Sequence, residues 1–294
     1  MSHKVNTFLL NTHHLKGAKK DVTYRADRGS LKTIRKFLER KKIDFDLLDW
    51  NIDGHLHGNH GGRGLAVEYD PRDRDEALRE RLGEDKFIVL NSSGFFHHRS
   101  FYFVESLKEE VCYVQLDSHP DILKRTEGKL RAGGFVPDIA GLDNVSSVYV
   151  VGVTPGEDLV SEEESIENAR EVIGDINLVL STPLEELIME RGKENSKRYG
   201  VDYEAVYRAA MELYPHLSHD QKPTEFNVDE LPDLPVYLSI DLDVIRMFPT
   251  YWQGHGRWST INVLEKIHEI ADKREIIGAD ICGLDGNFLR QKPL

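Results

Sequence analysis

The chain has 294 residues, of which 39% are apolar and 30% charged, and its formal net charge is −13 at pH 7. This is the composition of an ordinary globular protein with enough apolar residues for its own core. The negative charge argues against nucleic acid or an anionic membrane as the main partner. No apolar run reaches the roughly eighteen residues of a membrane span, and the N-terminus lacks a signal-peptide pattern. We therefore expect a cytoplasmic protein.

Short apolar runs alternate with amphipathic segments from one end of the chain to the other. Several runs are apolar almost throughout, which is typical of strands covered on both faces of a parallel sheet. Helical periodicity predicts helices at Ser30–Leu38 with Ser30 as the cap, from Ser161 onward, across 183–217, and at Ser259–Lys273. Strands are predicted at Val5–Leu10, Ile43–Trp50, Lys86–Asn91, Glu110–Asp117, Ser147–Val153, Ile176–Ser181, Val236–Asp243 and Ile276–Leu284.

This alternation predicts an α/β fold of three layers, α/β/α, around a mostly parallel sheet of about eight strands. We assign residues 1–294 to a single domain because no stretch has the length and composition of a linker between domains. The longest irregular stretch, 222–235, is rich in Pro, Asp and Asn, and we expect it to be a surface excursion. Cys112 and Cys282 lie inside apolar runs without paired spacing, which predicts small buried residues in a reducing compartment.

Two acidic motifs each close a predicted strand. They are Asp117-Ser-His119-Pro-Asp121 and Ser239-Ile-Asp241-Leu-Asp243. Residues two apart in an extended chain project the same way, and the carboxyl ends of parallel strands share one edge of the sheet. Four carboxylates crowded together would repel one another without a cation, so the motifs predict a metal site, most economically with two ions. Each motif alone could instead be a strand-end turn capped by its first Asp.

A further ligand is expected after the strand at 86–91, where Gly94-Phe-Phe-His97-His98 opens a helix. Adjacent helical residues point in different directions, so only one of the two His residues is expected to reach the metal. We favour His97 and place His98 behind it or toward substrate. Both could also be ordinary polar residues at a helix start. Carboxylate and imidazole donors without a thiolate suit Mn²⁺, Zn²⁺, Fe²⁺ or Co²⁺ better than Ca²⁺.

These motifs resemble those of the ureohydrolase superfamily, which includes arginase, agmatinase and formimidoylglutamase. The match covers Gly94 to His97, both acidic motifs in the right order, and the last strand at Gly278–Asp285. The Asp-Ser-His-Pro-Asp variant is most similar to an arginase-like branch that includes peptide arginases. The resemblance implies two Mn²⁺ ions bridged by Asp117 and Asp241. It also implies His97 and Asp121 on one ion, and His119 and Asp243 on the other.

The implied reaction is attack of a metal-bridging hydroxide on a guanidino carbon, with release of urea. The implied partner is a small guanidino compound such as arginine or agmatine, or an arginine-containing peptide, and arginase relatives often form homo-oligomers. The chain departs from the family in three places. Asp243 is followed by Val244-Ile245-Arg246 where arginases usually have a further Asp-Pro. Ile122–Phe135 contains no His, and Gly283 stands where a Glu would hold the guanidinium. Asp280 and Asp285 are the available substitutes for that Glu.

Because Ile122–Phe135 contains no His, we look for the proton-transfer group in other loops that contain His. His57 lies in the His- and Gly-rich stretch 53–62, and His255 lies in 254–258. We take His57, His255 and Asp285 as the candidate catalytic residues. The stretch at 53–62 could also be a solvated loop, and its His-x-His pattern is shared with the TIM-barrel amidohydrolases.

Two alternative functions keep the metal. One is an amide hydrolase or deacetylase of the same architecture with a single Zn²⁺, because the missing Glu leaves room for an amide substrate. The other is a non-catalytic metal-binding protein, which the missing loop His would favour. Fold alone does not separate them.

Overall fold

The structure is a computed structural model that describes residues 5–12, 22–50, 56–58, 65–68, 82, 86–91, 94–122, 129–131, 133–153, 176–180, 226–246, 248 and 256–283. Its main feature is an eight-stranded sheet in the order β2-β1-β5-β11-β10-β6-β8-β9, in which every neighbouring pair is parallel. All eight predicted strands are found. They are β1 (Asn6–Thr12), β2 (Asp46–Trp50), β5 (Phe87–Leu90), β6 (Val111–Leu116), β8 (Val145–Val153), β9 (Ile176–Leu180), β10 (Val236–Asp241) and β11 (Ile276–Cys282).

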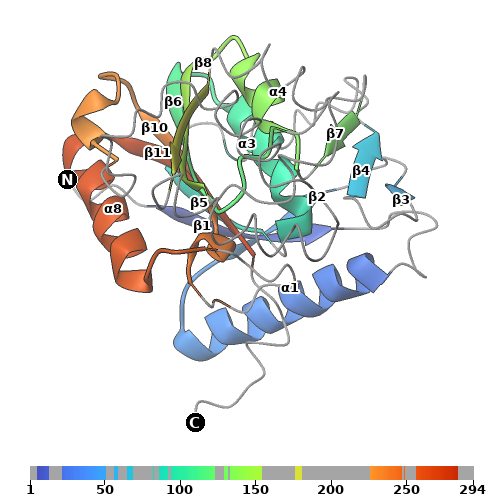
Figure 1. Cartoon of the computed structure of the whole chain (residues 1–294). Helices are drawn as coiled ribbons and strands as arrows, with labels where there is room; N and C mark the ends of the chain where they lie inside the picture. The colour runs from blue at the N-terminus through green and yellow to red at the C-terminus, as the bar shows by residue number, and fades with distance from the viewer. Residues whose placement is uncertain are drawn as a thin grey trace, which may run out of the picture.

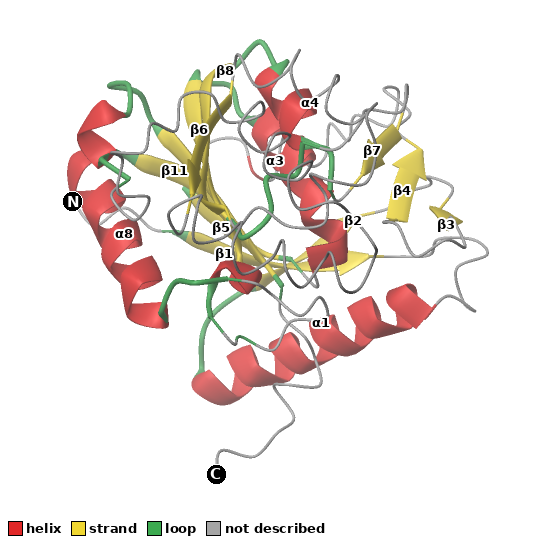
Figure 2. Cartoon of the chain, in the orientation of Figure 1, coloured by secondary structure: helices red, strands yellow, loops and turns green. Residues whose placement is uncertain are grey.

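Helices cover both faces of this sheet (Figures 1 and 2). On one face lie α3 (Ser100–Ser106) and α4 (Val136–Ala140), and on the other lie α1 (Val22–Lys41) and α8 (Thr260–Lys273). Strand β6 shows why its sequence is apolar except for Gln115. Its Tyr113 packs in the core beneath α3 and α4, while Val114 packs in the core beneath α8. The three-layer α/β/α prediction is confirmed.

A smaller antiparallel sheet was not predicted. It has the order β3-β4-β7 and consists of β3 (Leu56–Gly58), β4 (Leu65–Glu68) and β7 (Lys129–Arg131). Strands of three or four residues are too short to show a period of two in the sequence. The main sheet is open, with β2 and β9 at its two edges. This excludes a TIM barrel, so the amidohydrolase interpretation of the His-x-His pattern is wrong.

Two other predictions need correction. Helix α1 begins at Val22, so Ser30 lies inside it and is not its cap. A Ser in the interior of a helix costs only about 0.5 kcal/mol relative to Ala, and tertiary packing commonly outweighs a helix propensity of this size. The described part of the irregular stretch, 226–235, is not a surface excursion, because Phe226, Val228 and Leu231 are buried in the core beneath α8. Residues 161 and 183–217 lie outside the described residues. Among the described helices none is long and apolar enough to cross a membrane.

Candidate metal centre

The predicted ligands gather where four adjacent strands of the main sheet end. In the sheet these strands follow one another as β5, β11, β10 and β6. Strand β6 leads into Asp117, β10 ends at Asp241, and the chain after β5 forms the 3₁₀ helix η2 (Gly94–Arg99) that carries His97. Ligands in open α/β folds bind outside the carboxyl ends of such strands. The parallel order therefore brings together motifs that are far apart in the sequence.

Each acidic motif turns at the end of its strand. The Asp117 Oδ1 accepts a hydrogen bond of 2.7 Å from the backbone N–H of His119, and the Asp241 Oδ1 accepts one of 3.0 Å from that of Asp243. Asp121 has a φ of 50°, in the left-handed region. We expected the side chains of each motif to converge because residues two apart in an extended chain project the same way. In the structure they converge instead because each motif forms a turn capped by its first Asp. Capping uses only Oδ1 of each first Asp, which leaves Oδ2 for the site.

His97 faces one half of the site. Its Nδ1 lies 3.0 Å from Asp117 Oδ2, 3.2 Å from Asp121 Oδ2 and 3.8 Å from Asp241 Oδ2. Its other nitrogen, Nε2, lies 2.8 Å from the hydroxyl of Ser239, which fixes the orientation of the ring. When Nε2 carries the proton and donates to Ser239, the lone pair of Nδ1 points at the three carboxylates.

His119 faces the other half. Its Nδ1 lies 2.7 Å from Asp243 Oδ2 and 3.6 Å from Asp117 Oδ1. The backbone N–H of Ser118 donates to Asp243 Oδ1 at 3.1 Å and so ties the two motifs directly to each other. The His119 side chain is 30% exposed, whereas the carboxylates around it are almost fully buried. Among the described residues of the site, His119 is therefore the one most open to solvent.

Burial and charge repulsion shift the titration of the carboxyl groups. Burial, then the charges of Asp243 and Asp117, raises the pKa of Asp241 to about 7. Burial and the Asp117 charge also raise the pKa of Asp121 well above its ordinary value. Burial alone would raise the pKa of Asp117 too, but hydrogen bonds with His119 and His97 hold it well below that value. The cluster carries more negative charge than its two His residues comfortably balance.

The donor geometry fits metal ions. Three groups of side chains have ligand atoms within 4.8 Å of one another: His97 with Asp117 and Asp121, Asp117 with His119 and Asp243, and His97 with Asp241 and Cys282. Consider two donor atoms that each lie ~2.1 Å from a shared ion. When the donor–metal–donor angle is between a right angle and the tetrahedral angle, the two donors lie about 3.0–3.4 Å apart. The contacts of His97 Nδ1 with Asp117 and Asp121 fall in this range. His97 Nδ1 is buried and has no hydrogen-bond partner among the described residues.

Two glycines let the backbone approach Asp241. A Cβ at Gly94 would lie 2.5 Å from Asp241 Oδ2, and one at Gly283 would lie 2.4 Å from Asp241 Oδ1. Gly283 also has a φ of 83°, which favours glycine. The position where the family carries its guanidinium-holding Glu is thus closed to any side chain in this backbone conformation.

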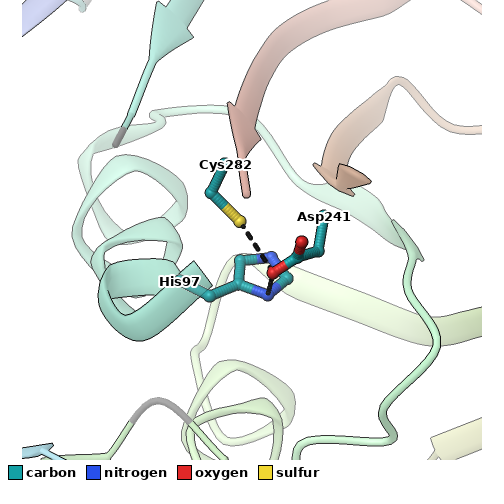
Figure 3. Close-up of side chains that lie close together, drawn as sticks. All are labelled: His97, Asp241 and Cys282. Atoms are coloured by element: carbon teal, nitrogen blue, oxygen red, sulfur yellow. Dashed lines mark hydrogen bonds and ion pairs between the residues drawn. The ribbon is translucent and has the colours of Figure 1, made fainter. Parts of the chain in front are cut away.

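Two residues of the site were not predicted. The Gln115 amide donates to Asp117 Oδ2 at 2.7 Å and to Asp121 Oδ2 at 3.1 Å, and it is fully buried. A Gln inside an otherwise apolar strand is the signal that could have identified it, since buried polar residues are rarely without a role. The Cys282 thiol donates to Asp241 Oδ2 at 3.2 Å (Figure 3), so a sulfur atom that the sequence analysis did not include lies beside the predicted donors. Its apolar neighbours gave no sign of this contact.

The other predicted site residues lie elsewhere. His98 is buried, and burial, helped by Arg99, lowers its pKa to about 3, so its ring is neutral at physiological pH. Asp280 is also buried, and its carboxylate oxygens accept from Ser100 and Tyr237, so it is committed to internal hydrogen bonds and does not replace the missing Glu.

The predicted catalytic residues stay predictions. The structure places His57 in β3, paired with Ala66 of β4. His255 and Asp285 lie outside the described residues.

Comparison with known proteins supports the fold. No family model matches the chain. An uncharacterized protein of Thermotoga maritima is 22% identical over 253 residues, which cover 86% of this chain and 72% of that protein. Among solved structures, formimidoylglutamase from Bacillus subtilis aligns with a TM-score of 0.55 at 14% identity, over 97% of this chain and 81% of that one.

Two further structures extend this likeness. Trypanosoma cruzi formiminoglutamase with Mn²⁺ has a TM-score of 0.51 at 11% identity, covering 98% of this chain and 88% of that one. Entamoeba histolytica arginase in complex with L-ornithine has a TM-score of 0.52 at 12% identity, covering 99% and 94%. At these identities the likeness concerns the fold. The chain has an arginase-like fold, as predicted.

Proposed function

We propose that this protein is a metal-dependent hydrolase that cleaves a C–N bond of a guanidino compound and releases urea. One observation carries the proposal: six side chains suited to two ions lie together where the central strands of a ureohydrolase fold end. They are His97, Asp117, His119, Asp121, Asp241 and Asp243. Solved proteins with this fold are named formimidoylglutamase, formiminoglutamase and arginase. These names refer to enzymes that act on formimino or guanidino groups.

The arrangement suggests how two ions would be shared. Asp117 belongs to two of the three donor groups, with a different His in each, and so would bridge the ions. The resemblance to the ureohydrolases implies Asp241 as the second bridge. His97 and Asp121 would complete one ion, and His119 and Asp243 the other. Two Mn²⁺ ions are our first choice, with Zn²⁺, Fe²⁺ or Co²⁺ as alternatives. Such a pair supplies Lewis acidity and a hydroxide nucleophile at neutral pH.

Substrate reaches the site from the His119 side, where that side chain is 30% exposed. A guanidinium is cationic, and the net charge of −13 favours its approach over that of a nucleic acid. We propose a small guanidino compound or an arginine-containing peptide as substrate. His57, His255 and Asp285 are the proposed proton-transfer and substrate-binding residues, and a cytoplasmic homo-oligomer is the proposed setting.

A second candidate is amide hydrolysis by the same fold. The closed position at Gly283 favours it, because the carboxylate that would pair with a guanidinium has no place there. The two candidates differ in ion count. The ureohydrolase proposal requires two ions per chain, and a deacetylase-like enzyme requires one Zn²⁺.

The test is urea release from free arginine, agmatine, guanidinobutyrate and arginyl peptides after Mn²⁺ loading, with the bound metal counted. Urea release with two ions per chain is the expected result. Asp117→Asn and Asp241→Asn should abolish it while the fold is kept. Asp143→Asn makes the same chemical change on an exposed residue of the loop before β8 and should leave it intact. Two bound ions with no urea from any of these compounds would contradict the proposal.

A further inference from the structure

Cys282 contacts a carboxylate of the candidate metal centre. It is the last residue of β11 and is directly opposite Asp241 of β10 in the register of the sheet. Its side chain is fully buried, yet it belongs to none of the described hydrophobic core clusters. Its Sγ lies 3.2 Å from Asp241 Oδ2, and Figure 3 shows the thiol directed at that carboxylate and at His97.

The side chain of His97 points at the same place. It is 1% exposed, and its Nδ1 has no hydrogen-bond partner among the described residues. The same nitrogen lies 3.8 Å from Asp241 Oδ2, and the His97, Asp241 and Cys282 donor atoms are all within 4.8 Å of one another. A buried imidazole nitrogen that faces three carboxylates and a thiol is arranged as a metal ligand is.

The spacing suits a sulfur ligand. Metal–sulfur bonds of ~2.3 Å and metal–oxygen bonds of ~2.1 Å place two donors of one ion about 3.1–3.6 Å apart, between right-angle and tetrahedral arrangements. The 3.2 Å between Cys282 Sγ and Asp241 Oδ2 lies within this range. A plain hydrogen bond from a thiol would account for that one distance, but not for the buried Nδ1 of His97, which faces the carboxylates of Asp117, Asp121 and Asp241.

The second cysteine provides a comparison within the chain. Cys112 is as buried as Cys282, but it lies at the opposite end of the sheet in β6, and its sulfur accepts a hydrogen bond of 3.3 Å from Ser147. It belongs to none of the donor groups among the described residues. Burial alone therefore does not bring a cysteine to a metal-binding arrangement in this fold.

We propose that Cys282 is a thiolate ligand of the ion held by His97 and Asp241, which makes that position an N, O, S site. This inference rests on the proposed function, because it concerns one ion of the same pair. The thiol proton leaves to solvent when the ion binds. Sulfur donors favour softer divalent ions, so this position would prefer Zn²⁺, Fe²⁺ or Co²⁺ over Mn²⁺. The other position, with only N and O donors, would take Mn²⁺ readily.

Cobalt titration of the metal-free protein tests the ligation. A thiolate bound to Co²⁺ gives an intense sulfur-to-metal charge-transfer band in the near ultraviolet, which N and O ligands do not give. We expect the band in the unmodified protein and in Cys112→Ser, and we expect its loss in Cys282→Ser and Cys282→Ala. Affinity for Zn²⁺ at this position should fall by about 10-fold or more in both Cys282 variants, while affinity for Mn²⁺ changes less.

Bound cobalt is counted and circular dichroism recorded for every variant, so that a folding defect is recognised. An unmodified protein that binds Co²⁺ without the band would overturn the inference, as would a band that survives in Cys282→Ser. Urea release is measured on the same preparations. Urea without the band leaves the proposed function intact and rejects only the thiolate. The band without urea keeps the thiolate and counts against the proposed function.

Discussion

At the scale of single residues, Gln115 has the most testable role. Its amide donates to both Asp117 and Asp121, and its own carbonyl accepts from the Tyr113 hydroxyl at 2.8 Å. Residues that orient metal ligands through hydrogen bonds are typically worth about 10–100-fold in metal affinity. We expect Gln115→Leu to weaken metal binding by this amount, as measured by calorimetric titration with Mn²⁺.

The control for this prediction is Tyr113→Phe, which removes only the hydroxyl that holds Gln115. Its effect on metal affinity should be smaller than that of Gln115→Leu. Equal affinities for Gln115→Leu and the unmodified protein would show that Asp117 and Asp121 are held in place by the backbone alone.

Gly283 gives a second prediction at this scale. Gly283→Ala places a Cβ 2.4 Å from Asp241 Oδ1 on a residue whose φ is 83°. A non-glycine residue in a strained backbone conformation costs about 1–3 kcal/mol. We expect a loss of this size in the free energy of unfolding by urea, together with weaker metal binding.

Gly141→Ala is the matched substitution. Its Cβ would meet only backbone oxygens at 3.6 Å, an ordinary contact, and its φ is −86°. The free energy of unfolding should change by less than ~0.5 kcal/mol, as for most surface substitutions. A Gly283→Ala protein as stable as Gly141→Ala would mean that the turn after β11 relaxes freely.

Residue types in the motifs identified the side chains that cluster at the strand ends, but not everything around them. Only one of His97 and His98 was expected to reach the site, because neighbouring helical residues diverge, and only His97 belongs to the described donor groups. Gln115 was missed because its contacts with Asp117 and Asp121 depend on how the chain turns after β6. Cys282 was missed because its contact with Asp241 depends on which strand lies next to β11. That neighbour comes from the order of the sheet, which no local pattern records.

At the scale of elements, helix α8 matters because it joins the strands that carry Asp241 and Cys282. Ser259 caps it: the Ser259 hydroxyl accepts from the Asn262 backbone N–H at 3.1 Å, and the Asn262 side chain accepts from the Ser259 backbone N–H at 3.0 Å. Loss of such a cap costs about 1 kcal/mol. We expect Ser259→Ala to lower the free energy of unfolding by this amount in urea titrations.

Thr260→Ala is the neighbouring control, since Thr260 is exposed and alanine is a better helix former. It should leave stability unchanged within ~0.5 kcal/mol. An equal loss in both variants would mean that the capping box does not stabilise α8.

Strands were easier to predict than helices in this chain. A parallel strand buried on both faces is a continuous apolar run, and all eight were found within a few residues of their observed limits. Helix α1 was predicted to start late because a Ser at position 30 resembles a cap. The strands of the small antiparallel sheet owe their pairing to neighbours distant in sequence, such as Val67 with Leu130, so their short segments carry no pattern of their own.

At the scale of the whole molecule, the cluster of buried carboxyl groups makes stability depend on pH, and we expect it to depend on the proposed metal ions as well. In the metal-free protein the pKa of Asp241 is about 7 and that of Asp121 is also raised, mainly by burial. The folded state then holds protons that the unfolded chain releases above about pH 4. Stability must therefore fall as pH rises from about 4 through 7.

The His residues of the site act in the same direction. Burial lowers their pKa, but Cys282 and Asp117 for His97, and Asp243 and Asp117 for His119, raise it well above the ordinary value. A raised His pKa stabilises the fold below about pH 6.5 and this stabilisation is lost as pH rises through the folded-state pKa. The lowered pKa of Asp117 acts with the opposite sign, but only below about pH 4.

We therefore expect the melting temperature of the metal-free protein to decrease between about pH 5 and 8. Bound cations replace the protons, so the metal-loaded protein should show no such decrease and should gain most stability from metal at the higher pH. Thermal unfolding with EDTA and with excess Mn²⁺, at constant ionic strength across this range, measures both curves. Parallel curves would mean that the metal binds outside the cluster of buried carboxylates, because only ions within that cluster can compensate its charge.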